Sequence, residues 1–258
     1  MLPYLLICII SLVGSGLTFF SGFGLGTILM PVFALYFPLE TAVALTAIVH
    51  FLNNVFKLLL VYKHANKQVV LKFGLPSVLT AIIGAYVLLH LSTLPEIYSY
   101  NFQSHLFKIS GLKLILAALI IFFCLFDLIP ALANLSFNAK YLPLGGALSG
   151  FFGGLSGNQG ALRSAFLLRA GLNKESYIAT GVLIACMIDI SRLSIYAASF
   201  NQNLLEVDPI LMIAATLSAF AGAFIGNRLI KKVTIQSFKY FVASTLIIFS
   251  ILLASGIL

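Results

Sequence analysis

The sequence predicts an all-α polytopic membrane protein built from two inverted repeats, each a broken, Gly-rich re-entrant hairpin followed by three transmembrane helices. Three observations support this prediction. Of the 258 residues, 61% are hydrophobic and only 9% are charged, whereas soluble domains carry roughly 25% charged residues. Apolar runs of about 20 residues, long enough to cross a bilayer core, recur along the whole chain. A Gly-rich stretch interrupts these runs twice, at corresponding positions of the two halves.

Eight hydrophobic segments are expected, four in each half of the chain. The first repeat, residues 1–130, has a broken segment over 3–37 and helices over 39–62, 70–91 and 106–130. The second repeat, residues 131–258, has a broken segment over 140–170 and helices over 174–198, 207–228 and 236–256. A shift of 135 residues places similar side chains on one helix of each repeat: Glu40 on Glu175, Asn54 on Asp189 and Lys57 on Arg192.

The distribution of basic residues indicates that each broken segment enters and leaves on the same side. With two hairpins, the loops 63–72 and 228–239 are cytoplasmic, as the positive-inside rule requires. That side then collects Lys63, Lys67, Lys72, Lys140, Arg169, Lys174, Arg228, Lys231, Lys232 and Lys239, and the outside keeps Lys108 and Lys113. Eight simple crossings would put many of these cations outside. A broken segment of about 34 residues would also reach ~50 Å as one helix, against a core of ~30 Å. The alternative is a long helix that is kinked or steeply tilted.

The two Gly-rich breaks are the predicted substrate site. Interrupted hydrophobic segments at matching positions of two halves point to a transporter binding site, and the free N–H groups of the helices that follow favour anions. The predicted substrate-binding residues at the breaks are Ser21, Gly22, Gly24 and Gly26 in the first half, and Ser156, Gly157, Asn158, Gln159 and Gly160 in the second. The alternative is that these glycines only allow close helix packing. We prefer that alternative for Gly14, Gly16, Gly145, Gly146 and Gly150.

Arg163 follows the second break by three residues, and the matching region of the first half has no charge. A guanidinium at membrane depth is costly and is usually functional or paired. Its planar set of donors suits an anionic oxygen group, so Arg163 is a further predicted substrate ligand. The alternative is that its side chain extends to the cytoplasmic surface.

Polar side chains on the helix after each break are candidates for gating or coupling. His50, Asn54 and Lys57 share one face of the first such helix, and Asp189 and Arg192 lie three residues apart on the second. Asp189 is the one carboxylate in the middle of a predicted crossing, which makes it the best candidate proton carrier. The alternative is a structural ion pair between Asp189 and Arg192. Lys57 could instead extend to the surface, and His50 could be a buried histidine with satisfied hydrogen bonds.

Several other functions find no support in the sequence. No HExxH, GxSxG or P-loop motif is present, so we expect no enzyme activity. The cysteines Cys8, Cys124 and Cys186 lie in apolar segments without a metal-binding spacing, so neither a metal nor another cofactor is expected. The net charge of +8 reflects basic loops that set topology, and nucleic acid is not an expected partner.

The chain resembles the TauE/SafE family of sulfite and organosulfonate exporters along nearly its whole length. The resemblance is carried by Gly22-x-Gly24-x-Gly26 with Pro31, by Thr41–Thr46, by Gly153-Gly154 to Gly160, and by Ala179-Thr180-Gly181. The second break departs from the family pattern, because Asn158-Gln159-Gly160-Ala161-Leu162-Arg163-Ser164 stands where a Gly-rich tip is usually followed by Pro.

The resemblance implies a multi-pass permease of the bacterial inner (plasma) membrane that exports small sulfur oxyanions or organosulfonates. The predicted function is therefore secondary transport of a small anion, held between the two breaks, by alternating access. The expected partners are the anion, the lipid bilayer and a coupling proton or sodium ion, and a homo-oligomer is compatible with the sequence. The alternatives are a passive anion channel and a membrane-embedded accessory subunit.

Overall fold

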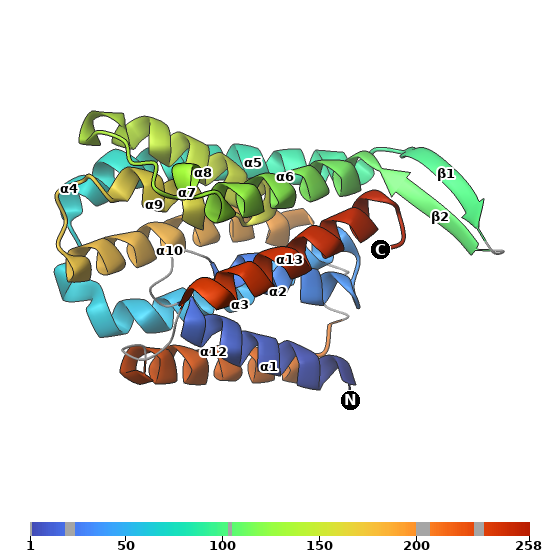
Figure 1. Cartoon of the computed structure of the whole chain (residues 1–258), viewed down its shortest axis with the longest axis horizontal. Coiled ribbons are helices and arrows are strands. Elements are labelled where there is room, and N and C mark those ends of the chain that lie inside the picture. Colours follow the sequence, from blue (N-terminus) through green and yellow to red (C-terminus); the bar gives the residue numbers. More distant parts are fainter. Residues whose placement is uncertain (1, 19–23, 103–104, 200–206, 230–234) are drawn as a thin grey trace.

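The computed structural model describes residues 2–18, 24–102, 105–199, 207–229 and 235–258, which form a layered bundle of helices with one β-hairpin at its end (Figure 1). Within these residues, four helices are long and apolar enough to cross a membrane: Leu39–His64, Lys67–Thr93, Lys174–Ser199 and Pro209–Gly226. Shorter apolar helices cover Pro3–Leu17, Leu25–Ala34, Gly111–Phe126 and Val242–Ala254. The chain is thus a helical, multi-pass membrane protein.

The helices follow the predicted segments closely. In the first half they are α1 (Leu2–Leu17), α2 (Leu25–Ala34), α3 (Leu39–Val61), α4 (Lys67–Val69), α5 (Leu75–Thr93), α6 (Gly111–Leu128) and α7 (Pro130–Ala133). In the second half they are α8 (Leu142–Ser156), α9 (Gly160–Leu167), α10 (Lys174–Ser199), α12 (Pro209–Leu229) and α13 (Ile235–Ala254). Short helical turns at Tyr62–His64, Val70–Gly74 and Ala139–Tyr141 join some of them.

Each Gly-rich break separates two helices that fold back on each other. In the second half, α9 returns along α8, and a Cβ on Gly145 would lie 2.3 Å from the ring of Phe166. In the first half, α2 returns along α1, so that Ile7, Leu29 and Phe33 share one buried cluster. The open ends of the two hairpins face opposite ends of the bundle. The α1–α2 pair opens toward the β-hairpin, and the α8–α9 pair opens toward the far end (Figure 1).

The first helix of each hairpin packs against a helix of the other half. Helix α8 runs parallel to α5, and Cβ atoms on Gly146, Gly150 and Gly154 would each lie 2.1 Å from a carbonyl oxygen of the α5 segment. Helix α1 runs parallel to α12, where a Cβ on Gly222 would lie 2.0 Å from the carbonyl oxygen of Leu12. Such close backbone approach holds helices together in lipid, where apolar burial alone drives little association. The packing function that we preferred for Gly145, Gly146 and Gly150 fits this geometry.

A hydrogen bond joins the starts of α1 and α12 at the end of the bundle that carries the β-hairpin. The Tyr4 hydroxyl donates to the Asp208 carboxylate, and this bond holds the pKa of the Asp208 carboxyl below its usual value. The carboxylate also caps α12, because Asp208 Oδ1 accepts from the backbone N–H of Ile210 at 2.8 Å.

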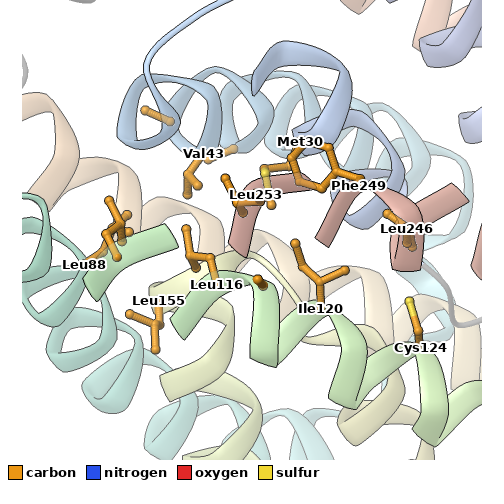
Figure 2. Close-up of a cluster of buried hydrophobic side chains, with 14 of the residues drawn as sticks. Met30, Val43, Leu88, Leu116, Ile120, Cys124, Leu155, Leu246, Phe249 and Leu253 are labelled. Carbon is orange, nitrogen blue, oxygen red and sulfur yellow. The ribbon is translucent and has the colours of Figure 1, made fainter. Parts of the chain in front are cut away.

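One large apolar cluster lies between the two halves. It contains Met30, Val43, Leu88, Leu116 and Leu155, together with residues of α10 and α13, and all of these are almost inaccessible to solvent. Figure 2 shows that side chains from α2, α3, α5, α6, α8 and α13 meet there. This cluster fixes the position of α2 and of the end of α8, one of the two helices at each break.

The sequence prediction missed the β-hairpin. Strands β1 (Glu96–Phe102) and β2 (His105–Ser110) pair antiparallel where the start of a helix was expected at residue 106. The helix begins at Gly111, because the Ser110 side chain caps it by accepting from the backbone N–H of Lys113 at 3.3 Å. Tyr100 stacks on Phe107, and its hydroxyl donates to the carbonyl of Ser255 at 2.7 Å, which ties the hairpin to the end of α13.

Candidate functional site

The two breaks meet in the middle of the bundle. A Cβ on Gly26, in the first turn of α2, would lie 3.8 Å from the carbonyl oxygen of Gly157 in the second break. The same position is 3.7 Å from the side chains of His50 and Thr46 on α3. Gly157 adopts φ +78, a left-handed conformation that glycine takes readily, and it ends α8 there. Gly24, Gly26 and Gly157 are thus brought together as predicted, and Ser21 and Gly22 lie outside the described residues.

A small cavity of about 60 Å³ lies beside this meeting point. It is bordered by both hairpins and by the helices that follow them. Its lining residues are Thr18, Gly24, Leu25, His50, Asn54, Lys57, Arg163, Ser164, Leu167, Tyr177, Ile178, Gly181 and Val182. Three of these side chains are basic, and no lining residue in the described part of the chain carries a carboxylate. Such a lining favours a small anion, because each cationic or donor group is placed in a site of low dielectric constant.

Next to the cavity, α3 and α10 are joined by a buried ion-pair network. His50 Nδ1 lies 2.7 Å from Asp189 Oδ2, and Asn54 Nδ2 donates to the same oxygen at 3.4 Å. Arg192 donates to Asp189 Oδ1 from Nε at 3.0 Å and from Nη2 at 2.7 Å. Asp189 and Arg192 are fully inaccessible to solvent. Both carboxylate oxygens therefore face positive or donor groups, which offsets the cost of burying this charge.

Lys57 lies on the same face of α3 and contacts Asn53, which in turn contacts α1 and α12. The Asn53 amide donates to Ser15 Oγ at 3.0 Å and to the carbonyl oxygen of Ala219 at 3.2 Å. With the amide nitrogen facing Ser15 and Ala219, the amide oxygen of Asn53 accepts from Lys57 Nζ at 3.3 Å. Lys57 is 5% exposed, so its side chain does not extend to the surface as the alternative supposed. It is held toward the cavity that it lines.

Arg163 also lines the cavity, from the first turn of α9, and it is only partly buried. Its Nη1 donates to Gln159 Oε1 at 3.3 Å, which directs the guanidinium along the helix toward the second break. The tip of that break holds buried polar atoms without a hydrogen-bond partner among the described residues. They are Asn158 Nδ2 and Oδ1 and Gln159 Nε2. Nη1 of Arg192 on α10, which lies 3.0 Å from the position of a Cβ on Gly157, has no such partner either. Buried donors without partners are costly, so a ligand or water is expected to contact them.

The remaining predicted residues have local structural contacts. Ser156 Oγ donates to the carbonyl of Phe152 at 3.1 Å and accepts from the backbone N–H of Asn158 at 3.4 Å. Gly160 is the first residue of α9. Neither Ser156 nor Gly160 lines the cavity, which Gly24, His50, Asn54, Lys57 and Arg163 do.

Sequence reasoning missed some cavity and network residues. Asn53 was overlooked, although an amide four residues before a lysine on an apolar helix is a usable signal. Thr18, Tyr177 and Gly181 line the cavity, and no local pattern distinguishes them from ordinary packing residues. Their position depends on how α9 and α10 approach the first hairpin.

Comparison with known families identifies a match over almost the whole chain. Residues 6–253 match the family described as "Sulfite exporter TauE/SafE". No curated protein and no solved structure matches the chain.

Proposed function

Because the chain belongs to the TauE/SafE sulfite exporter family, a family of membrane transporters for sulfur compounds, we propose that it is a secondary transporter that exports small sulfur oxyanions. The observation that carries the proposal is the cavity where the two breaks meet. Three basic side chains line it, those of His50, Lys57 and Arg163, and the lining includes no carboxylate. A transported anion would be held there by these cations and by the backbone N–H groups at the start of α2.

The lining of the cavity disfavours an aminosulfonate. Its ammonium group would lie near Lys57 or Arg163, and the described lining residues include no carboxylate to pair with it. Like charges in such a site repel each other strongly. Sulfite, sulfate and thiosulfate are therefore better candidates than organosulfonates that carry an amine.

The proposed mechanism is alternating access between two inverted repeats, residues 1–130 and 131–258. The hairpins open toward opposite ends of the bundle (Figure 1). The helix contacts are also reciprocal, because α1 packs on α12 as α8 packs on α5. An inversion that exchanges the two halves predicts this reciprocity. Movement of the repeats against each other would expose the central site first to one side of the membrane and then to the other.

Anion binding tests the proposal through Arg163. In purified protein, sulfite, sulfate or thiosulfate should raise the melting temperature in a saturable way, because a ligand of the folded state stabilises it. Arg163→Ala removes a cavity donor and should weaken binding about 10- to 100-fold, the range for a hydrogen bond to a charged group. Arg169→Ala, which removes an exposed arginine at the end of the same hairpin, is the matched control.

Two results would contradict this proposal. Equal affinity in Arg163→Ala and the parent protein would exclude the guanidinium as a ligand. An absence of any shift with all three anions, compared with chloride, would exclude the substrate class. Saturable counterflow in liposomes would then separate a carrier from a passive channel.

The topology is tested by labelling single cysteines in a variant whose three native cysteines have been replaced. Loops 63–72 and 168–173 lie together at one end, where Ser176 Oγ donates to the carbonyl of His64 at 2.6 Å. Cysteines at Lys67 and Asn173 should therefore both be protected from an impermeant maleimide in intact cells, and a cysteine at Ser99 should react. If Lys67 and Asn173 were labelled from opposite sides, the second broken segment would cross the membrane as one helix.

A further inference from the structure

The two ring nitrogens of His50 face different surroundings. Nδ1 lies 2.7 Å from Asp189 Oδ2, inside the ion-pair network. Nε2 lies on the side of the first break, 3.7 Å from the position of a Cβ on Gly24, and both His50 and Gly24 line the cavity. A carboxylate at hydrogen-bonding distance holds the ring proton on Nδ1. In neutral His50, the lone pair of Nε2 then lies on the cavity side, where Asn54 Nδ2, itself at the cavity, is 3.3 Å away.

His50 lies among several titratable or charged side chains. The titratable or charged side chains near it are Asp189, Arg192 and Tyr177 on α10, Lys57 on α3 and Arg163 on α9. Arg192 contacts Oδ1 of Asp189 while His50 contacts Oδ2, so each carboxylate oxygen already has a partner. Asp189 is also not among the residues that line the cavity.

We propose that His50 takes up one proton at Nε2 when an oxyanion enters the cavity, so that anion and proton occupy the site together. This inference rests on the proposed anion transport. A neutral Nε2 presents a lone pair to an anion and repels it, whereas the imidazolium presents a donor and a positive charge. The proton comes from the water on the side to which the cavity is open, and the ring returns it when the anion leaves. Asp189, expected from sequence to carry the proton, is instead a positioning residue that fixes the His50 tautomer.

Calorimetric titration of the purified protein measures this proton uptake directly. Sulfate and thiosulfate are suitable probes, because neither takes up a proton near neutral pH. The buffers should be imidazole, Bis-Tris and Tris, which differ in ionisation enthalpy and contain neither phosphate nor sulfonate. The dependence of the binding heat on the buffer gives the number of protons bound. Near neutral pH, where all three buffers work, we expect about one proton taken up per anion bound.

Three variants assign the proton to a residue. His50→Gln should abolish the uptake and weaken sulfate binding ~10-fold, because the charged donor is lost. Lys57→Arg keeps the charge of the second cavity cation but cannot titrate, so the uptake should remain. His64→Gln, which removes an exposed histidine at the end of α3, should leave both affinity and uptake unchanged.

Each result that would contradict the proposed proton uptake has a different meaning. Sulfate or thiosulfate binding without proton uptake in the parent protein would overturn the inference and leave the proposed anion transport standing. Uptake that persists in His50→Gln, or that disappears in Lys57→Arg, would assign the proton to another group. If His50→Gln does not fold, the parent protein and Lys57→Arg still decide the question. If neither anion binds to the parent protein, the proposed substrate class fails as well.

Discussion

Replacement of Asp189 by leucine should lower the free energy of unfolding by about 3–5 kcal/mol, the cost of removing one partner from a buried ion pair. Arg192 is fully inaccessible and donates twice to Asp189 Oδ1. Without the carboxylate, the guanidinium would remain buried beside His50 with no opposite charge. The ion pair also joins α3 to α10 through His50, so its loss would loosen the helices that border the cavity.

A second variant separates this ion-pair effect from a general disturbance of packing. In Asp189→Leu/Arg192→Met, both charges are replaced by apolar side chains, and most of the lost stability should return. The chain has no tryptophan, so unfolding is best followed with a thiol-reactive dye. Cys124 and Cys186 are buried and will react as the protein melts. If the single and double variants melted at the same temperature, the ion pair would not be the source of the loss.

Replacement of Gly150 by valine should prevent α5 and α8 from packing together. A Cβ at this position would already lie 2.1 Å from the carbonyl oxygen of Ser77 and 2.5 Å from Thr80 Oγ1. The nearest obstacle is backbone, which no rotamer change can move, so the two helices would have to separate. The neighbouring contacts of Gly146 and Gly154 would be lost with it. We expect a destabilisation of roughly 3 kcal/mol or more, at the upper end of the range for overpacked sites.

The matched control is Gly111→Ala, at the start of α6. There the nearest atom to a new Cβ is the side-chain Cδ1 of Ile97, at 3.6 Å, an ordinary contact. The parallel test is Gly222→Ala on α12, which should resemble Gly150→Val because the Leu12 carbonyl lies 2.0 Å from the Cβ position. Normal yield and melting temperature of Gly150→Val in detergent would show that α5 and α8 can separate without loss of the fold.

Much of the helical fold could be predicted because a long apolar run of sequence is typical of a membrane helix. The helix expected over 39–62 is observed as Leu39–Val61, and that expected over 174–198 is observed as Lys174–Ser199. The β-hairpin was missed because its strands are short and amphipathic, and the apolar run of the next helix extends into β2. The aromatic residues at alternate positions in β1, Tyr98 and Tyr100, were the signal in the sequence that could have predicted a strand.

Some of the predicted residues line the cavity, namely Gly24, His50, Asn54, Lys57 and Arg163, but the contacts between helices could not be predicted. Helical spacing correctly predicted that Asp189 and Arg192 would pair, because both lie on one helix. The contact of His50 with Asp189 crosses two helices that are far apart in sequence, and no local pattern specifies which faces of α3 and α10 meet. The same holds for the contact between Asn53 and the α1–α12 scaffold, which depends on the close approach that glycines allow.

The first helix of each hairpin packs against a helix of the other half, and this has a consequence for the synthesis of the protein. Helix α1 leaves the ribosome long before its packing partner α12, which begins only at Pro209. The face of α1 that will contact Gly222 must therefore wait in the bilayer, covered by lipid or by the insertion machinery, until most of the chain has been made. Helix α5 waits a much shorter time for α8. The first half thus cannot mature alone, and co-expressed fragments 1–130 and 131–258 should be recovered together or not at all.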